Sequence, residues 1–396
     1  MGWPKGKPRK SDDIESIAIK PVDQIPLENQ FIPFGKPDIS DQEIQAVVNV
    51  LRSGWIGTGK VSRQFEEAFV DYMGGGYAIS VSSCSIGLQL ALRVSCVGVG
   101  DEVLVPPLTF AATVNAVIRE GATPVFVDVD DRGCIDPWKM KEKLTNKTRA
   151  IIPVHYTGSA CDMGYLMDFA KRHDLKVIED TAHGFGGEYH DGKGMARKLG
   201  SIGDFGVFSF YPTKNITSGE GGMVVTRNGE LAERMRVLTN QGQTAGAWSR
   251  YTTGPIMAYE VIHDGYKGNM PDILASIGLA QIKRWDELRT KRMKIWNIYE
   301  DAFGLKEKGH SQHLFTIKAK NRDLFRQKMW EAGIGTGVHY NSLHLEPAYK
   351  FLRYSIGDFP MSERISKETV SLPVSSTMTE EDAHRVVKAV RLYKED

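Results

Sequence analysis

Short runs of apolar, often β-branched residues alternate with helix-like stretches from about residue 40 to residue 240. The apolar runs predict strands at Tyr77–Ser82, Glu102–Pro106, Pro124–Val129, Ala150–His155, Lys176–Asp180, Gly206–Phe210 and Met223–Thr226. Between the earlier runs, helical patterns cover Ser85–Cys96, Ala111–Arg119 and Met163–Arg172. Strands divided by helices imply crossover connections, so the pattern predicts an α/β fold whose mostly parallel sheet is flanked by helices.

The pattern changes after residue 270. Pro271–Phe303 is rich in helix-forming residues and predicts one long helix or two. A strand at His313–Lys318, a helix at Arg322–Ala332 and a terminal helix at Glu380–Tyr393 follow, which is typical of a smaller α+β domain. We therefore predict an N-terminal extension (1–31), a large domain (32–250), and a linker helix with a small C-terminal domain (251–396).

Composition excludes several classes of protein. The 396 residues contain 50 Lys and Arg against 49 Asp and Glu, so neither nucleic acid nor an anionic membrane is an expected partner. No apolar run approaches the roughly 18 residues of a membrane span, and the N-terminus lacks the apolar core of a secretory signal. Four scattered cysteines without a CxxC motif favour a reducing, cytoplasmic location. No metal site is predicted.

One lysine, Lys214, lies just after the predicted strand Gly206–Phe210, in the segment VFSFYPTKNITSGEGGMVVT. Most single lysines are solvated surface charges, but Asp180 ends another apolar strand 34 residues upstream. Parallel sheets bind ligands at the carboxyl ends of their strands, where both residues fall. The pair is typical of a pyridoxal 5'-phosphate enzyme, in which a lysine forms the Schiff base and an aspartate holds the pyridinium nitrogen.

Each residue of this pair has an expected chemical role. Desolvation and a nearby cation lower the pKa of a lysine, and the freed amine can then move a proton at the substrate carbon. The Asp180 carboxylate keeps the ring nitrogen protonated, although the same residue could instead cap a following helix. His183 is either a neighbour of the cofactor ring or a structural histidine.

A phosphate site is predicted where the segment SSCSIG (Ser82–Gly87) follows a strand and opens a helix. Helix N-termini bind phosphate through free backbone N–H groups, although ordinary serine capping explains the same pattern. Ser209 could add a hydroxyl. Phe110, in PPLTFAATVNA, follows a strand and turn and could stack on the pyridine ring or simply fill the core.

Many ordered segments make the chain resemble the DegT/DnrJ-type sugar aminotransferases, which are pyridoxal phosphate enzymes of fold type I. The resemblance covers more than 90% of the chain, from about Ile32 onward, through GKPDISDQEI, SGWIGTGKVSRQFEEAF, TFAATVNAV, ATPVFVDVD, IIPVHYTG, VIEDTAHGFGGEY, GDFGVFSFYPTKNITSGEGGMVVT and GIGTGVHY. It implies a seven-stranded sheet and a homodimer with shared active sites. At several positions the chain departs from the family pattern: Cys84, Ile86, Tyr211, the pair Gly268-Asn269, and a short segment between Phe303 and His313.

The resemblance also implies a role for each matching residue. Lys214, Asp180 and His183 take the catalytic positions. The cofactor positions fall on these three and on Ser85, Ile86, Phe110, Ser209 and, from a loop that reaches the neighbouring subunit's cofactor phosphate, Lys267 or Asn269. His339 and Tyr340 of GVHY are expected to bind substrate, although His339 could instead be a packing residue.

The implied activity is conversion of a nucleotide-linked keto sugar to an amino sugar, with L-glutamate as donor and 2-oxoglutarate as its product. WIGTG, IIPVHYTG and GIGTGVHY resemble the branch that aminates a UDP-4-keto-pentose for lipid A, which favours a UDP-4-keto sugar. A dehydratase branch carries His in place of the lysine, so Lys214 favours transamination. The alternatives are a pyridoxal phosphate enzyme acting on a non-nucleotide ketone or as a sugar dehydratase, and a non-catalytic sensor or binding protein.

Overall fold

The computed structural model of the chain describes residues 31–244, 259–304 and 306–394. The predicted N-terminal extension therefore lies outside the described residues except for Phe31. The predicted boundary between residues 250 and 251 also falls in a stretch that is not described, 245–258.

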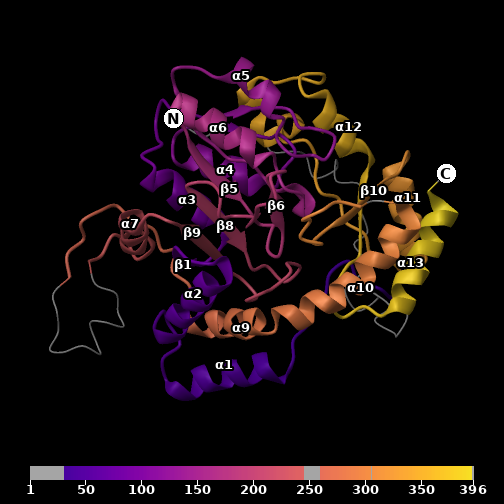
Figure 1. The fold of residues 1–396 in the computed structure, drawn as a ribbon, viewed down its shortest axis with the longest axis horizontal. Coiled ribbons are helices and arrows are strands. Elements are labelled where there is room, and N and C mark those ends of the chain that lie inside the picture. The colour runs from indigo at the N-terminus through magenta and orange to yellow at the C-terminus, as the bar shows by residue number, and fades with distance from the viewer. Residues whose placement is uncertain (1–30, 245–258, 305, 395–396) are drawn as a thin grey trace, which may run out of the picture.

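A seven-stranded sheet with the order β1-β9-β8-β5-β4-β2-β3 forms the centre of the fold (Figure 1). Its strands are β1 (Tyr77–Val81), β2 (Glu102–Val105), β3 (Thr123–Phe126), β4 (Thr148–Ile151), β5 (Lys176–Asp180), β8 (Phe205–Ser209) and β9 (Gly222–Thr226). Strand β9 is antiparallel to β1 and β8, whereas the pairs among β2, β3, β4, β5 and β8 are parallel. The predicted α/β fold with a mostly parallel sheet is confirmed, although β3 and β4 end earlier than the apolar runs indicated.

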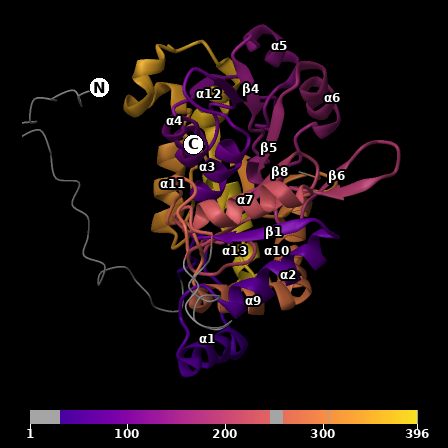
Figure 2. The same ribbon diagram turned by 90° about the vertical axis from the view of Figure 1, so that its left-hand side faces the viewer.

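Helices cover both faces of this sheet. Those of the large domain are α1 (Asp41–Ser53), α2 (Lys60–Met73), α3 (Cys84–Val94), α4 (Ala111–Arg119), α5 (Met140–Lys143), α6 (Met163–His173), α7 (Gly229–Thr239) and α9 (Asp272–Lys283). Along β2 the side chains alternate, so that Val103 and Val105 pack with α3 and α4 while Leu104 packs with α6 on the opposite face. Figure 2 shows α7 lying beside β1.

The small domain is built around a two-stranded antiparallel ladder of β10 (Phe315–Lys318) and β11 (Thr369–Leu372). Helices α10 (Trp285–Phe303), α11 (Arg322–Glu331) and α13 (Glu380–Tyr393) pack against it through an apolar cluster. The long helical pattern of Pro271–Phe303 is thus two helices, α9 and α10, which meet at Arg284. In Figure 1, α10 runs from beneath the sheet to α11 and α13.

Two segments connect the domains in a way that the sequence pattern did not indicate. Ile32 pairs with Ile334 and packs in the small-domain cluster. Between β10 and β11 the chain returns to the large domain, where Leu343, Tyr349 and Phe359 join the core on the α3 face of the sheet. This return includes two short 3-10 helices, Leu343–Leu345 and Pro347–Leu352, and α12 (Pro360–Glu368). It brings the segment after Gly337 beside the large-domain sheet.

Other short elements complete the described chain. A hairpin is formed by β6 (Glu188–His190) and β7 (Ala196–Lys198), and 3-10 turns lie at Pro137–Lys139 and Tyr156–Gly158. Among the described helices, none combines the length and apolar character needed to span a bilayer.

Candidate active site

Lys214 lies in the loop between β8 and β9, and hydrogen bonds fix this loop on both sides of it. The Lys214 backbone N–H donates to the Tyr211 carbonyl at 2.9 Å. The next side chain, Asn215, is buried and its amide donates to the carbonyls of Phe185 and Ser311, each at 2.8 Å. The amine is therefore presented from a rigid support at the carboxyl end of the sheet.

The surroundings of Lys214 favour its neutral form. Burial lowers the pKa of its amine to about 8, while the nearby Cys84 and Asp180 oppose that change. A lysine in water has a pKa near ~10.4, so the folded protein makes a much larger fraction of this amine nucleophilic at neutral pH.

Asp180 ends β5, and its carboxylate is buried and hydrogen-bonded. Oδ2 accepts from the Thr113 hydroxyl at 2.8 Å, and Oδ1 accepts from the Ala182 backbone N–H at 3.1 Å. The pKa of this carboxyl is raised, because burial outweighs the two hydrogen bonds and the Lys214 charge, which lower it. Since the carboxylate and the amine influence each other, the structure brings the two predicted catalytic groups together.

The residue before Asp180 secures the end of the same strand. Glu179 and His155 are fully buried, and His155 Nε2 lies 2.9 Å from Glu179 Oε2. The Glu179 carboxylate also accepts backbone N–H groups from Gly200, Ile202 and Gly203 at 2.7 to 2.9 Å. This network ties β5 to two loops and fixes the position of Asp180.

His183 lies in the turn after β5 and contacts aromatic residues from the small-domain side. Its Nε2 is 2.8 Å from the Tyr340 hydroxyl, and the two rings stack with centroids 5.8 Å apart. Its Nδ1 is buried and has no partner among the described residues. Burial and the Lys214 charge lower the pKa of His183, so the ring is neutral.

The predicted phosphate cradle lies at the N-terminus of α3. Ser83 is the N-cap, and its hydroxyl accepts the Ile86 N–H at 3.3 Å. Ser85 and Ile86, in the first turn of the helix, are partly exposed. At the end of β8, Ser209 is also partly exposed, and its hydroxyl accepts the Tyr211 N–H at 3.4 Å.

The loop with Lys267 and Asn269 packs beside this cradle in the same chain. The Ser82 N–H donates to the Gly268 carbonyl at 2.7 Å, and Asn269 pairs with Val81. The Lys267 amine donates to Asn269 Oδ1 at 2.6 Å. No neighbouring subunit is present, so the predicted contact of this loop across a dimer stays a prediction.

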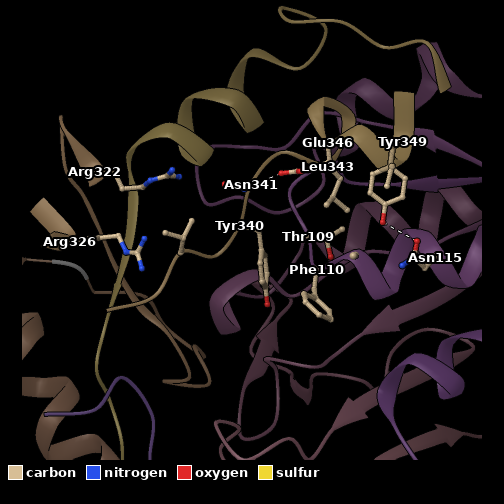
Figure 3. A pocket seen from close by; sticks show the side chains of 13 residues that line it. Thr109, Phe110, Asn115, Arg322, Arg326, Tyr340, Asn341, Leu343, Glu346 and Tyr349 are labelled. Carbon is tan, nitrogen blue, oxygen red and sulfur yellow. Dashed lines mark hydrogen bonds between the residues drawn. The ribbon is translucent and has the colours of Figure 1, made fainter. Parts of the chain in front are cut away.

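A cavity of about 640 Å³ opens next to Tyr340 (Figure 3). Phe110, at the N-cap of α4, is 61% exposed and lines it, with its ring centroid 5.9 Å from that of Tyr340. His339 is not among the lining residues. Its Nδ1 lies 2.8 Å from the Ser371 hydroxyl and its ring stacks on Phe34, so of the two expected substrate residues only Tyr340 borders this space.

These residues fit pyridoxal 5'-phosphate, the cofactor expected from the sequence. A buried acid beside a lysine of lowered pKa provides partners for the pyridinium nitrogen and the aldehyde. The N-terminus of α3, with Ser83 and Ser85, provides partners for the phosphate. The exposed Phe110 ring would offer an aromatic surface to the cofactor, and His183 Nδ1, which has no partner among the described residues, would offer a polar one.

Sequence reasoning missed several residues that support the site: Thr113, Glu179, His155, Asn215 and His313. Thr113 belongs to the TFAATVNAV segment, three residues after Phe110, and that spacing on a helix could have indicated it. His313 Nδ1 lies 3.1 Å from Asn215 Oδ1, a contact across 98 residues for which the sequence carries no signal.

Comparison with known proteins places the chain among relatives that cover nearly all of it. SpsC of Bacillus subtilis, a spore coat polysaccharide biosynthesis protein, is 40% identical over 382 residues, which are 92% of this chain and 97% of SpsC. An uncharacterized protein of Methanocaldococcus jannaschii is 42% identical over 383 residues, with 92% and 98% covered. Spr1654, a proposed sugar aminotransferase of Streptococcus pneumoniae solved in PMP and PLP forms, is 31% identical in the PMP form, with a TM-score of 0.85 and 92% and 99% covered.

The fold and these neighbours define a fold type I, pyridoxal phosphate-dependent aminotransferase architecture. The model of the DegT/DnrJ/EryC1/StrS aminotransferase family matches residues 37–391. The chain belongs to this family, and pyridoxal 5'-phosphate is its cofactor.

Proposed function

We propose that the protein transfers the amino group of L-glutamate to the keto group of a nucleotide-linked sugar, with a UDP-4-keto sugar as the first candidate. The observation that carries this proposal is the buried Lys214 amine, whose pKa is lowered to about 8 beside the Asp180 carboxylate at the carboxyl edge of the sheet. The polysaccharide role of SpsC and the sugar substrate proposed for Spr1654 support a sugar as the acceptor.

In this proposal Lys214 transfers the protons, and Asp180 stabilises the charge on the cofactor ring. When bound, pyridoxal phosphate supplies the electron sink that stabilises negative charge at the substrate carbon. Asp180 holds its own negative charge against the ring nitrogen, and Thr113 and Ala182 keep that carboxylate oriented. The Lys214 Nζ takes the proton from the donor carbon and later delivers a proton to the sugar carbon.

The remaining predicted residues bind and orient. The backbone N–H groups of Ser85 and Ile86 and the Ser209 hydroxyl hold the phosphate. Phe110 and His183 would contact the cofactor ring, and Tyr340 borders the cavity that would hold the sugar acceptor. A homodimer, in which Lys267 or Asn269 of one protomer reaches the phosphate of its partner, is part of the same proposal.

A panel assay tests the substrate. Purified protein with pyridoxal phosphate and glutamate is incubated with UDP-, dTDP- and GDP-linked keto sugars, and the products are identified by mass spectrometry. We expect an amino sugar and an equal amount of 2-oxoglutarate. Amination of a free cyclic ketone alone, or loss of the C3 hydroxyl from the sugar without amination, would contradict the proposal and favour another reaction on this scaffold.

A further inference from the structure

The cavity beside Tyr340 has a positively charged wall on the small domain. Arg322 and Arg326 are four residues apart on α11, so they lie on the same side of that helix. In Figure 3 both side chains extend from α11 toward the space beside Tyr340 and Asn341. Phe110, Asn115, Leu343, Glu346 and Tyr349 come from the opposite wall.

The two arginines differ in their bonding. Arg322 donates from Nη1 to the Ser366 carbonyl at 2.6 Å and from Nε to Asp323 at 3.0 Å. Within the described ranges, Arg326 has no hydrogen-bond or ion-pair partner, and its Nε is buried. A buried polar group without a partner is costly, because it has lost its hydration and gained nothing in return.

The Arg326 charge also acts on the site. Burial, Lys214 and Arg326 together lower the pKa of His339 to about 4. A guanidinium carries five N–H donors in a planar fork that matches the oxygens of phosphate or carboxylate groups. Arg326 is thus equipped to bind an anion that the described part of the chain does not supply.

The dimensions of the site favour one kind of anion. Arg326 lines the cavity and Lys214 does not. A group that binds Arg326 is therefore a part of the ligand that lies away from the reacting amine. About 640 Å³ lies within the ~300–1,000 Å³ typical of sites for larger ligands. The carboxylate on the opposite wall, Glu346, accepts a hydrogen bond from Asn341 at 3.0 Å. A ligand that spans from Tyr340 to Arg326 therefore carries its negative charge at the α11 end.

We propose that Arg326 is a specificity-determining residue that binds the diphosphate of the nucleotide-linked sugar, while the sugar lies beside Tyr340 and Phe110. This inference rests on the proposed function. It adds the residue that would distinguish a nucleotide-linked ketone from a free one.

Binding to the pyridoxal phosphate-loaded protein tests this assignment by titration calorimetry with UDP, dTDP, GDP, their nucleosides and inorganic pyrophosphate. We expect Arg326→Met to weaken binding of the preferred nucleoside diphosphate about 10- to 100-fold, with little change for the nucleoside. Arg326→Lys keeps the charge but loses the planar fork of donors. Its affinity for the nucleoside diphosphate should lie between those of Arg326→Met and the unchanged protein. Arg391→Met, an exposed arginine on α13, is the matched control and should bind as the unchanged protein does.

Two further readouts separate recognition from folding and from the donor reaction. Because Arg326 has no hydrogen-bond or ion-pair partner among the residues that the structure describes, Arg326→Met should melt no lower than the unchanged protein. Its half-reaction with glutamate should also be unchanged.

Equal affinity of Arg326→Met and the unchanged protein for nucleoside diphosphates would overturn the inference and leave the proposed function standing. Selective loss of the glutamate half-reaction would also overturn it, and would assign the guanidinium to the donor carboxylate. If the unchanged protein binds no nucleoside diphosphate, the nucleotide part of the proposed function fails and this inference fails with it.

Discussion

Two regions of the candidate active site are built in opposite ways. One is the floor, formed by Lys214, Asp180 and the residues that hold them; the other is the small-domain wall of the adjoining cavity, which includes Arg326. On the floor, the side chains that position Lys214 and Asp180 are bonded to other parts of the chain, as Asn215 and Thr113 show. On the wall, Arg326 has a buried Nε without a partner in the described part of the chain. In the proposed function, the protein itself preorganises the proton chemistry, whereas the substrate would supply the partner of Arg326.

The substitution with the largest expected effect removes the Lys214 amine. Lys214→Ala should lower the rate of amino transfer roughly 10⁴-fold, because the proton is then no longer moved by a positioned base. Stopped-flow absorbance with glutamate measures this rate, and borohydride reduction followed by peptide mass spectrometry locates the cofactor attachment. Lys171→Ala, an exposed lysine on α6, is the control. Retention of the attachment in Lys214→Ala would place the reactive lysine elsewhere.

The buried Glu179 network, which fixes the position of Asp180, should contribute mainly to the free energy of unfolding. Glu179→Ala removes the acceptor of three backbone N–H groups and of His155, all in a buried setting. We expect the free energy of unfolding to fall by about 3–5 kcal/mol. Urea titration measures it, with the exposed Glu67→Ala expected within about 0.5 kcal/mol of the unchanged protein. A loss below about 1 kcal/mol would show that the network does not hold the strand end.

The lowered pKa of Lys214 predicts a pH profile. The amine attacks only when neutral, so attachment of pyridoxal phosphate to the cofactor-free protein should accelerate as the pH rises and be half-maximal near pH 8. The increase of the visible absorbance band gives the rate at each pH, and N-acetyl-lysine is the comparison. A midpoint like that of the free amino acid would mean that burial does not activate the amine.

Tyr340 lies between the floor and the wall, and we expect its substitution to have the smallest effect on activity. Tyr340→Phe keeps the ring but removes one hydroxyl, which pairs with His183 at 2.8 Å. We expect a decrease of about 2- to 10-fold in kcat/KM for the sugar acceptor, which corresponds to one neutral hydrogen bond. Steady-state kinetics with both substrates measures it. A decrease larger than that of Lys214→Ala would place the proton chemistry at Tyr340.

Local elements of both domains could be predicted from the sequence for a physical reason. Lys176–Asp180 and Glu380–Tyr393 have the predicted bounds, because apolar strand periodicity and helix capping are local signals. Asp180 ends β5 and Lys214 follows β8, and the topology of a parallel sheet brings such strand ends together.

Contacts between distant segments carry no comparable signal. The return of Leu343–Phe359 to the large domain and the strand β11 depend on tertiary packing, and neither was predicted. Arg326 is one of several charged residues on an amphipathic helix, so its sequence alone does not distinguish a solvated arginine from an unpartnered one beside a cavity.

The most direct test of the central claim is the absorbance spectrum of the pyridoxal phosphate-loaded protein before and after glutamate is added. We predict that the visible band of the lysine-bound cofactor falls while the band of pyridoxamine phosphate rises, and that an equal amount of 2-oxoglutarate appears. A lysine-bound band that glutamate leaves unchanged would contradict glutamate as the donor. Failure of the protein to form that band at all would contradict the assignment of Lys214 itself.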